Sequence, residues 1–566
     1  MKLLFVLLAV HLAPSVYAVN SSSTSSLGPI INLGYASYAG NTTSSAGLED
    51  GPVVFYGNIP YAQLPVDDLR WRAPRMLNEE AQTSEVVDAR GWGPPCLQHP
   101  AMVGIGSEAD CLKVNVWKPK NVYEGDALPV AVYIHGGGFN ANSPQGFPLY
   151  NWVEQRGKLV GVSITYRLGL LGFLGGSLLA TDGDLNVGLL DQRAALEWIQ
   201  RHISKFGGDP NDITIYGESA GGASMVMQVT AYGGTRPVPF KRVVAQSIGF
   251  GPTLTEAEVE TAFLHASKII GCSSSDNVMS CLRRASLGAL VSAINSMPTN
   301  PSYQFSPVIE GPAGFLPGLP SRLIQSGNFS TVEFIGGHCT NDGRTFAGGA
   351  PEDFVTDSDI KRLVFSRWPA VSNATMAKAL TLYPSPQIPG SPFATQYDRA
   401  WTMAGEIIFT CMDWYLAESL ASRGVENVFS YSWDAPDTVL YNARPYLGAM
   451  HTSDLYYLFS GKDASFSTFG NAGNTFTPFN TVPKPTLSRE AINYWTAFAS
   501  TGDPSSDQDA HVPLWEKYVR SDTLRRMDLS RGNDTVTGSR MVTVPANEIA
   551  RCKFWMSEDV TAETRV

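Results

Sequence analysis

The sequence predicts an α/β fold built on a large, mostly parallel, twisted central sheet with helices on both faces. Runs rich in β-branched residues alternate with segments of helical periodicity, which is typical of a parallel or mixed sheet. The run 129–134 is almost continuously apolar, as expected of a strand buried on both faces. The chain has 566 residues, 43% hydrophobic and 16% charged, so it can bury a large core. No long linker divides it, and we expect a single domain over residues 31–556.

The first eighteen residues are predicted to be a signal peptide that is cleaved after Ala18. Lys2 gives a positive start, residues 3–12 are apolar, and residues 16–18 form the cleavage site. The apolar run is shorter than the roughly 20 residues that a membrane-spanning helix needs. Residues 557–566 are predicted to be a polar tail rather than a membrane anchor. We therefore expect a secreted, extracellular protein without a membrane span.

Residues 19–30 are rich in serine and are predicted to be a flexible N-terminus. Asn-x-Ser/Thr sequons in an exported chain are candidate glycosylation sites, although sequons also occur by chance. The five candidate asparagines are Asn20, Asn41, Asn328, Asn373 and Asn533.

The composition argues against some classes of partner. The formal net charge is −11 and no Lys/Arg cluster is present, so a nucleic-acid partner is not expected. The sequence has neither the Cys/His spacing of a metal site nor a glycine-rich phosphate-binding motif. We therefore expect no metal ion and no organic cofactor.

Seven cysteines in an exported chain suggest three disulfides and one free thiol. Cys96 and Cys111 flank a short loop, and so do Cys272 and Cys281. Spacing alone does not pair the other three, which are Cys339, Cys411 and Cys552.

The elements can be placed in chain order from their hydrophobic periodicity. Short strands with Gly and Asn-Thr turns are expected between residues 31 and 72. Longer strands are expected at 114–117, 129–134, 159–166, 213–216 and 242–246. Helices are expected at 189–206, where apolar residues recur on one face, and at 223–228. The Pro/Gly/Ser-rich stretches 297–320 and 385–393 are predicted to be ordered long loops.

A Gly-x-Ser-x-Gly turn lies between the strand 213–216 and the helix 223–228. It reads Gly-Glu-Ser-Ala-Gly, and its strand–turn–helix context is that of a nucleophile elbow. Gly217 and Gly221 must lack side chains because strand and helix nearly touch there. Ser219 is thereby expected above the sheet, at the positive end of the following helix. A plain surface Gly/Ser turn is the alternative, which the flanking elements disfavour.

Three consecutive glycines follow another predicted strand, in the segment His-Gly-Gly-Gly-Phe that begins at His135. Because a strand precedes it and the serine turn follows about eighty residues later, it is predicted to be an oxyanion loop rather than a flexible turn. The backbone N–H groups of Gly137, Gly138 and Ala220 would bind the negative oxygen that forms during acyl transfer. His135 is expected to anchor the loop by packing and not to carry a proton.

Longer segments resemble the type-B carboxylesterases, a family that also contains cholinesterases and fungal lipases. Residues 107–116 resemble the family's second signature, and residues 206–222 resemble its first. The segments 166–169 and 186–192 are also typical of the family. The resemblance covers most of the chain, and it is a resemblance to secreted fungal members of the family in particular. It implies the α/β-hydrolase fold, a serine carboxylesterase activity and a small-molecule ester as substrate.

The resemblance also assigns the other catalytic residues, in the chain order Ser, acid, His. His451 lies in a segment that resembles the family's catalytic histidine segment; a lone histidine would otherwise be a surface or core residue. Asp342 lies in a segment that matches the family's acid loop, although most members carry Glu there. An Asp is one methylene shorter but can still accept the histidine N–H. Ser247 matches a family serine that supports the triad by hydrogen bonding, with a plain surface serine as the alternative.

The resemblance further implies a disulfide between Cys411 and Cys552, which would pin the C-terminal helix to the body of the protein. The expected bridges are then Cys96–Cys111, Cys272–Cys281 and Cys411–Cys552. Cys339 would remain a free thiol, three residues before Asp342.

The expected reaction is hydrolysis of neutral carboxylic esters through an acyl-enzyme on Ser219, with His451 as base and Asp342 as orienting acid. A catalytically silent, cholinesterase-like binding protein is disfavoured because all three residues are present. A lipase or a sterol or feruloyl esterase of the same family is the other alternative. The loop 97–110 has only fourteen residues of mixed character, which disfavours the long lid of a true lipase.

The same loop predicts the character of the pocket. Cholinesterases carry a tryptophan inside the loop closed by the first disulfide, and its ring face binds a quaternary ammonium. The loop 97–110 contains no aromatic residue. We therefore expect an aliphatic, uncharged pocket wall that suits neutral esters, and poor hydrolysis of choline esters.

Overall fold

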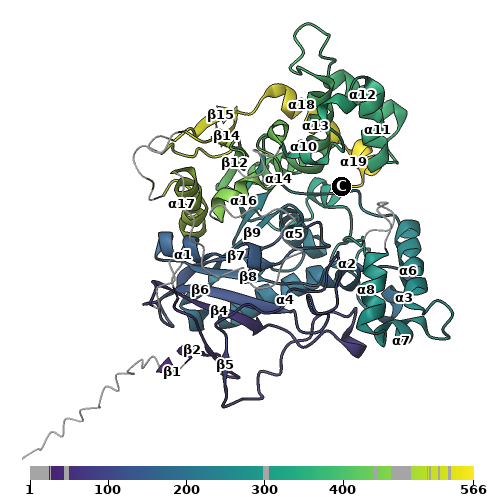
Figure 1. Ribbon diagram of the computed structural model, residues 1–566. Helices are drawn as coiled ribbons and strands as arrows, with labels where there is room; N and C mark the ends of the chain where they lie inside the picture. The colour runs from purple at the N-terminus through teal and green to yellow at the C-terminus, as the bar shows by residue number, and fades with distance from the viewer. Residues whose placement is uncertain are drawn as a thin grey trace, which may run out of the picture.

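Figure 1 shows one large twisted sheet with helices on both faces. The computed structural model describes residues 24–25, 27–43, 50–296, 305–437, 444–459, 486–506, 508, 512–520, 523–532 and 537–566. The predicted signal peptide, residues 1–18, lies outside the described residues, and so do the sequons at Asn20 and Asn533.

Within the described residues, eleven strands form the central sheet. They are β4 (Val53–Pro60), β6 (Lys113–Pro119), β7 (Leu128–Ile134), β8 (Val160–Ile164), β9 (Gly208–Glu218), β10 (Arg242–Gln246), β11 (Glu333–Cys339), β12 (Val428–Trp433), β13 (Val519–Arg520), β14 (Thr523–Leu529) and β15 (Arg540–Thr543). The order is β13-β14-β12-β11-β10-β9-β7-β8-β6-β4, and β15 pairs with β14. Neighbours from β8 to β14 are parallel, and the strands outside them are antiparallel.

Helices cover both faces of this sheet. Those before β11 are α1 (Tyr150–Arg156), α2 (Gly169–Phe173), α3 (Ser177–Asp182), α4 (Val187–His202), α5 (Ala220–Thr230), α6 (Glu256–Ile270), α7 (Val278–Arg283), α8 (Leu287–Asn295) and α9 (Pro320–Gln325). Those after it are α10 (Asp342–Phe346), α11 (Asp357–Arg367), α12 (Asn373–Leu382), α13 (Gln396–Gly405), the π-helix η7 (Glu406–Thr410), α14 (Cys411–Ser422), α16 (Ser453–Leu458), α17 (Thr486–Thr501), α18 (Ala546–Trp555) and α19 (Glu558–Thr564). Helices α1 and α17 pack on one face, and α4, α5 and α14 pack on the other.

The central strands are buried on both faces, which explains their continuous apolar runs. Successive side chains of a strand point to opposite faces of the sheet. Ile215 and Val243 therefore join the core beneath α4, α5 and α14. Their neighbours Tyr216 and Val244 join the core beneath α1 and α17. Two apolar cores thus fix the sheet between its helices.

The predicted elements correspond closely to the observed ones. The five longer predicted strands are β6, β7, β8, β9 and β10, and the two predicted helices are α4 and α5. Residues 385–393 form turns and bends between α12 and α13, as expected of a long loop. The described part of the other predicted loop, from residue 305, lacks helix and strand until α9 begins at Pro320.

The N-terminal segment 19–30 is not flexible throughout, contrary to the expectation. Strand β2 (Gly28–Asn32) belongs to a small sheet with β1 (Thr24–Ser25), β3 (Ser37–Ala39) and β5 (Val86–Asp88). Ile30 pairs with Ala39 in this sheet. Backbone pairing therefore orders residues 28–30 although the segment around them is rich in serine.

The segment 557–566, predicted to be a polar tail, forms helix α19 over most of its length. Val560, Thr564 and Val566 are buried. Arg565 forms an ion pair with Glu258 at 2.6 Å. The polar composition was a poor guide here because a few buried residues at helical spacing suffice to dock a helix.

The three expected disulfides are present, and Cys339 is a buried free thiol. The longest of the three loops is closed by Cys411 and Cys552, which join the start of α14 to α18. Across the residues that the structure describes, no helix is both long and apolar enough to span a bilayer.

The predicted site residues lie on loops that leave the carboxyl ends of neighbouring parallel strands. The triple glycine follows β7, Ser219 follows β9, Ser247 follows β10, and Asp342 comes shortly after β11. Because β7, β9, β10 and β11 are adjacent and parallel, these loops emerge at the same edge of the sheet. Ligand sites of open α/β sheets occur at this edge.

Candidate active site

Ser219 lies at the tip of a tight turn between β9 and α5. Its backbone has φ 60° and ψ −122°, a strained combination for a residue with a side chain. A Cβ on Gly217 would come within 2.5 Å of the carbonyl group of Gly221, and a Cβ on Gly221 would lie 2.3 Å from the carbonyl oxygen of Ile134. Ser219 is half-buried, whereas the other residues of the turn are buried. The turn therefore presents the serine side chain to the cavity above the sheet.

The triple-glycine loop lies beside this turn. Gly137 and Gly138 have φ values of 108° and 62°, and both line the same cavity as Ser219. Their N–H groups take part in none of the backbone hydrogen bonds of the described loops. Ala220 is the first residue of α5, where helical N–H groups have no intrahelical acceptor. Three N–H donors are therefore free for a ligand next to Ser219.

His135 packs beneath the glycine loop. Its ring stacks on Tyr166 with 4.6 Å between ring centroids, and the Tyr166 hydroxyl donates to the His135 carbonyl at 2.8 Å. Burial lowers the pKa of His135 to about 4, so this ring stays neutral under ordinary conditions. The packing agrees with the anchoring role that the sequence suggested.

Asp342, His451 and Ser247 meet although they are far apart in the sequence. His451 Nδ1 donates to Asp342 Oδ1 at 2.8 Å. The Ser247 hydroxyl donates to Asp342 Oδ2 at 2.8 Å, and the backbone N–H of Cys339 donates to the same oxygen at 3.0 Å. Ser247 is fully buried, so it is not a plain surface serine.

The Nε2 atom of the His451 imidazole lies close to the carboxylate of Glu218. Phe346 and Phe409 hold the ring, with centroid distances of 5.1 and 4.6 Å. His451 Nε2 lies 3.2 Å from Glu218 Oε1 and forms no hydrogen bond with any described residue. The sequence reasoning did not single out Glu218, although its place directly before Ser219 in the turn was visible.

The buried charges around His451 are coupled. Burial raises the pKa of Glu218, although the neighbouring His451 opposes this shift. Burial alone would lower the pKa of His451, but Glu218 and Asp342 outweigh it and raise that pKa above its usual value. When Glu218 is protonated it carries no charge and no longer favours the imidazolium. The ionisation of Glu218 therefore influences whether His451 is neutral and able to accept a proton.

A second buried carboxylate lies behind this group. Asp454 accepts a hydrogen bond from Gln246 at 2.6 Å, and its other oxygen lies 3.7 Å from the Cys339 sulfur. Burial raises the pKa of Asp454 to about 6 and raises the pKa of the Cys339 thiol well above its usual value. Asp454 has no hydrogen bond with His451, so Asp342 is the carboxylate that orients the imidazole.

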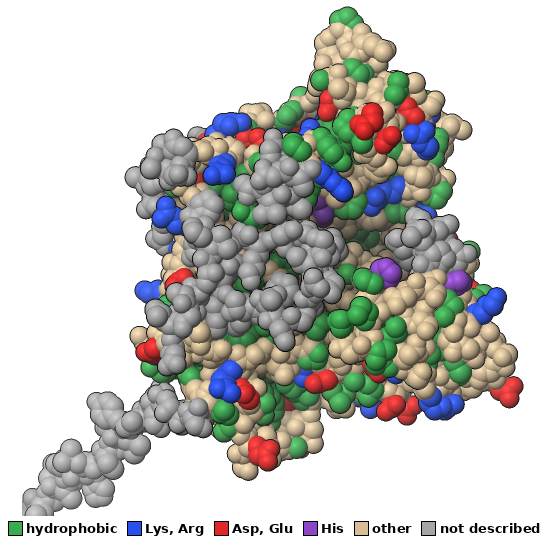
Figure 2. Space-filling view, in the orientation of Figure 1, with side chains coloured by type: hydrophobic (Ala, Val, Ile, Leu, Met, Phe, Trp, Pro, Cys, Tyr) green, Lys and Arg blue, Asp and Glu red, His purple; other side chains and the backbone are tan. Residues whose placement is uncertain are grey.

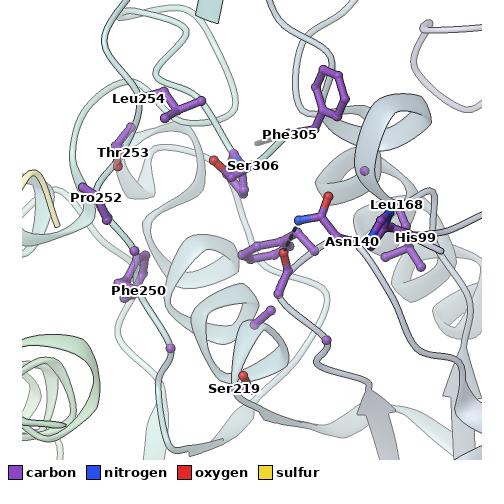
Figure 3. A pocket seen from close by; sticks show the side chains of 18 of the residues that line it. His99, Asn140, Leu168, Ser219, Phe250, Pro252, Thr253, Leu254, Phe305 and Ser306 are labelled. Atoms are coloured by element: carbon purple, nitrogen blue, oxygen red, sulfur yellow. Dashed lines mark hydrogen bonds between the residues drawn. The ribbon is translucent and has the colours of Figure 1, made fainter. Parts of the chain in front are cut away.

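Ser219 and His451 line a cavity of about 500 Å³. Figure 2 shows a hollow on this face of the molecule, with hydrophobic side chains along its lower edge. In Figure 3, Ser219 lies at the base, with Phe250 and Leu254 on one wall and His99 and Leu168 on the other. A cavity of this size suits a small organic ligand.

The cavity wall is not aliphatic and uncharged, contrary to the expectation from the loop 97–110. Phenylalanines and one arginine from other segments also line it, namely Phe139, Phe250, Phe305, Phe346, Phe409 and Arg367. The loop itself contributes Leu97, Gln98 and His99. The expectation failed because it treated one loop as the whole wall.

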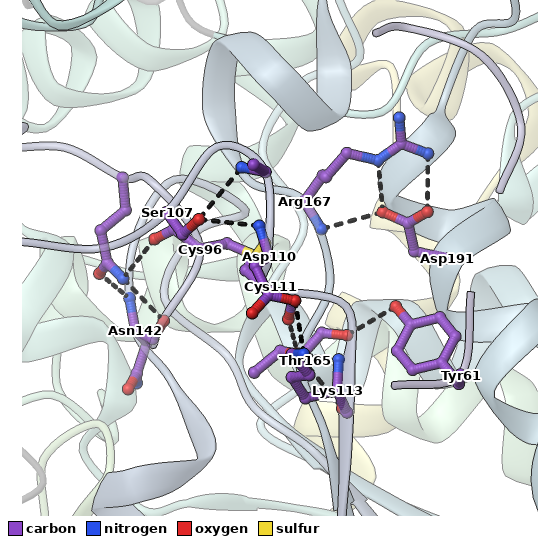
Figure 4. The surroundings of a disulfide bond; sticks show 12 residues. Tyr61, Cys96, Ser107, Asp110, Cys111, Lys113, Asn142, Thr165, Arg167 and Asp191 are labelled. Atoms are coloured by element: carbon purple, nitrogen blue, oxygen red, sulfur yellow. Dashed lines mark hydrogen bonds and ion pairs between the residues drawn. A yellow bond between two sulfur atoms is a disulfide. The ribbon is translucent and has the colours of Figure 1, made fainter. Parts of the chain in front are cut away.

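The disulfide Cys96–Cys111 fixes this loop at the cavity (Figure 4). Inside it, the Ser107 hydroxyl accepts hydrogen bonds from two backbone N–H groups, at 3.1 and 2.8 Å. Beside it, Arg167 forms a buried bidentate ion pair with Asp191, with N–O distances of 2.7 Å. The Thr165 hydroxyl, just after β8, donates to the Cys111 carbonyl and so ties the base of the loop to the end of a sheet strand.

The comparisons with known proteins agree with this architecture. The model of the carboxylesterase family matches residues 28–549. A secreted lipase of Arthroderma benhamiae is 30% identical over 487 residues, which cover 82% of this chain and 83% of the relative. Lipase 1 of Geotrichum candidum is 30% identical over 545 residues, which cover 87% of this chain and 94% of the relative.

A solved structure supports the same fold. The crystal structure of Aspergillus niger EstA resembles this chain with a TM-score of 0.80 and 28% sequence identity, covering 95% of this chain and 99% of that one. The mostly parallel sheet and its helices are therefore the α/β-hydrolase fold. The chain belongs to the carboxylesterase family and is a carboxylic ester hydrolase.

Proposed function

We propose that this protein is an extracellular serine carboxylesterase that forms an acyl-enzyme on Ser219. One observation carries the proposal: the strained turn exposes Ser219 in a cavity that also contains His451 and three free N–H donors. A nucleophile, a base and an anion-binding group are the parts that acyl transfer requires.

In the proposed mechanism, Ser219 Oγ attacks the ester carbonyl while His451 Nε2 takes its proton. Asp342 holds the Nδ1–H and stabilises the imidazolium that forms. The N–H groups of Gly137, Gly138 and Ala220 hold the oxyanion, and removing one such donor typically costs about 2.7–4 kcal/mol of transition-state stabilisation. His451 then protonates the leaving alcohol, and a water activated by the same ring releases the acid.

Glu218 is assigned an electrostatic part in this mechanism. Its carboxylate lies 3.2 Å from His451 Nε2, the atom that takes the proton of Ser219 in this mechanism. Ionised Glu218 favours the imidazolium and raises the pKa of His451, whereas protonated Glu218 has no such effect. Ser247 is assigned a supporting part, because its hydrogen bond fixes the carboxylate of Asp342.

The apolar lining supports hydrolysis of esters of short and medium acids. A lipase is a second candidate, favoured by exposed apolar side chains on the loop 97–110. Met102 is 52% exposed and Val103 is 68% exposed. Such residues could contact a lipid droplet. Hydrolysis of an emulsified triglyceride that rises steeply above its solubility limit would support the lipase, and a rate that saturates below that limit would support the esterase.

Secretion is part of the proposal and rests on the predicted signal peptide at residues 1–18. Two sequons have exposed asparagines, Asn328 and Asn373, and are the better candidates for glycosylation. The side-chain amide of Asn41 instead donates to the carbonyl of Arg90 at 3.1 Å. Mass spectrometry of the secreted protein before and after glycosidase treatment tests these assignments.

The test of the nucleophile is the variant Ser219→Ala. It should lose hydrolysis of p-nitrophenyl butyrate to a residual of order 10³–10⁴ over water, and should lose labelling by a fluorophosphonate. Ser306→Ala is the matched control, because Ser306 lines the same cavity and should still permit labelling at Ser219. A folded Ser219→Ala protein with a tenth of the wild-type kcat would refute the proposal.

A further inference from the structure

Arg367 places a positive charge in the wall of the proposed active site. It is the last residue of α11 and lines the same cavity as Ser219 and His451. Among the described residues of the lining there is no Asp, Glu or Lys. Figure 2 shows Lys and Arg atoms along the upper edge of the hollow. Arg367 is thus the one permanently charged side chain among the described residues of the lining.

The guanidinium of Arg367 has neither a hydrogen-bond partner nor an ion-pair partner among the described residues. Its Nε is buried and forms no hydrogen bond, and no described carboxylate pairs with the group. Three other arginines of this region each have at least one hydrogen-bond or ion-pair partner. Arg362 pairs with Asp359, Arg399 with Asp357, and Arg344 donates to the carbonyl of Tyr446. Both aspartates of α11 therefore already form ion pairs with other arginines.

The position of the guanidinium is set by aromatic packing. Its central carbon lies 5.0 Å from the centroid of Phe346 and 5.7 Å from that of Trp368. Phe346 in turn contacts the ring of His451. Stacking on a ring occupies the face of a guanidinium and leaves its N–H groups free in the plane. These groups suit the two oxygens of a carboxylate, which arginine binds through two parallel hydrogen bonds.

A structural role alone does not explain this placement. An arginine at a helix C-terminus is favoured by the helix dipole, but an exposed side chain would gain the same benefit. The buried Nε of Arg367 has given up water without gaining a hydrogen-bond partner among the described residues, which is costly. Burial lowers the pKa of Arg367 to about 10, so the group is still charged at neutral pH. A ligand that brings a negative charge would offset that cost.

We propose that Arg367 binds an ionised carboxylate of the substrate, so that the enzyme prefers esters carrying a second, free carboxylate, such as hemiesters of dicarboxylic acids. This inference rests on the proposed esterase function. The net charge of −11 disfavours anionic substrates at long range, so the preference depends on a short, desolvated contact. A cationic ester would be repelled by Arg367 and would find no carboxylate among the described residues that line the cavity.

Wild-type protein gives the first test, using three p-nitrophenyl esters of equal chain length. They are the adipate hemiester, the hexanoate and the trimethylammonio-pentanoate ester, which end in a carboxylate, a methyl group and a cation. At salt near 1 M, where the screening length is about 3 Å, long-range repulsion is removed. We expect the highest kcat/KM for the hemiester and the lowest for the cationic ester. A hemiester no better than the hexanoate would overturn the proposal.

The variant Arg367→Met keeps an unbranched apolar side chain and removes the guanidinium and its charge. The ratio of hemiester to hexanoate kcat/KM should fall roughly 10- to 100-fold, the usual loss for a hydrogen bond to a charged group. Arg367→Lys should recover part of the ratio. Arg362→Met is the matched control, because it removes an equal charge from an exposed position on the same helix and should leave the ratio unchanged. Equal losses for both esters in Arg367→Met would overturn the proposal.

Two further arms locate the carboxylate and separate this inference from the proposed function. A p-carboxyphenyl ester compared with a p-carbamoylphenyl ester of butyrate tests a carboxylate on the alcohol side. Calorimetry of hemiester binding to Ser219→Ala, with and without Arg367→Met, requires no turnover. An Arg367-dependent affinity in an inactive protein would support the carboxylate site even if the acyl-enzyme mechanism were wrong. Equal affinities would refute the site while leaving esterase activity intact.

Discussion

At the scale of single residues, the site is organised around the carboxylate of Asp342, both of whose oxygens accept hydrogen bonds. Asp342 Oδ1 accepts from His451, and Oδ2 accepts from Ser247 and from the backbone of Cys339. These three hydrogen bonds fix the short side chain of Asp342. They hold the carboxylate plane, and the plane in turn fixes which imidazole nitrogen carries the proton.

Asp342→Asn should lower kcat by roughly 10⁴, because an amide can donate to Nδ1 and then favours the wrong imidazole tautomer. Steady-state hydrolysis of a neutral ester measures the effect. Asp454→Asn is the matched control, since Asp454 is equally buried but bonds to Gln246 instead of the imidazole. If Asp454→Asn lost more activity than Asp342→Asn, the assignment of the orienting acid would have to change.

Glu218→Gln should move the acidic limb of the kcat/KM profile to lower pH. Ionised Glu218 stabilises the imidazolium of His451 and raises its pKa, so more base is needed to free Nε2. The amide has no charge, so the pKa of His451 falls and activity appears at a lower pH. Glu426→Gln, at an 87% exposed side chain, is the control for the change in net charge. A shift to higher pH, or none, would contradict the assigned coupling.

At the scale of elements, local signals in the sequence were sufficient for the strands that carry the site. The apolar runs of β7 to β10 predict buried strands, because a strand that is buried on both faces is apolar along its whole length. The glycines of the serine turn are equally informative, since a Cβ at Gly217 or Gly221 would collide with the backbone. The turn and the glycine loop were therefore predictable from residue type and order.

Other parts of the site depend on contacts that a linear sequence does not contain. The meeting of His451 with Glu218 depends on a ring orientation that is set by Phe346 and Phe409. Arg367 lies more than a hundred residues from Ser219, and its lack of an acid partner is a property of three-dimensional packing. Helix α19 was missed for the same reason, because its docking is decided by the few residues that it buries.

At the scale of the whole molecule, the sheet converts distant sequence segments into one site. Adjacent parallel strands deliver the glycine loop, the serine turn and the acid loop to one edge. The C-terminal region must then be held against this framework, because α13, η7 and α14 connect the acid side of the cavity to α18. Two links join α18 to that region. Cys552 is bonded to Cys411, and Arg551 forms a buried bidentate ion pair with Glu406 at 2.6–3.0 Å.

The disulfide Cys411–Cys552 should contribute more to stability than Cys272–Cys281. In the chain-entropy model the stabilisation grows with loop length, reaching about 5 kcal/mol for a separation of 141 residues and about 2.6 kcal/mol for a separation of 9. Measured values are often smaller, so the order of the two bridges is the sharper prediction.

The pairs Cys411→Ser/Cys552→Ser and Cys272→Ser/Cys281→Ser can be compared by urea unfolding followed through tryptophan fluorescence. The first pair should unfold at the lower urea concentration, and the ion pair Arg551–Glu406 should limit the loss, because it still ties α18 to η7. Peptide mapping of the intact protein must also find Cys339 as a free thiol. A first pair that unfolds no earlier than the second would show that the ion pair and the packing of α18 already constrain the C-terminal region without the covalent link.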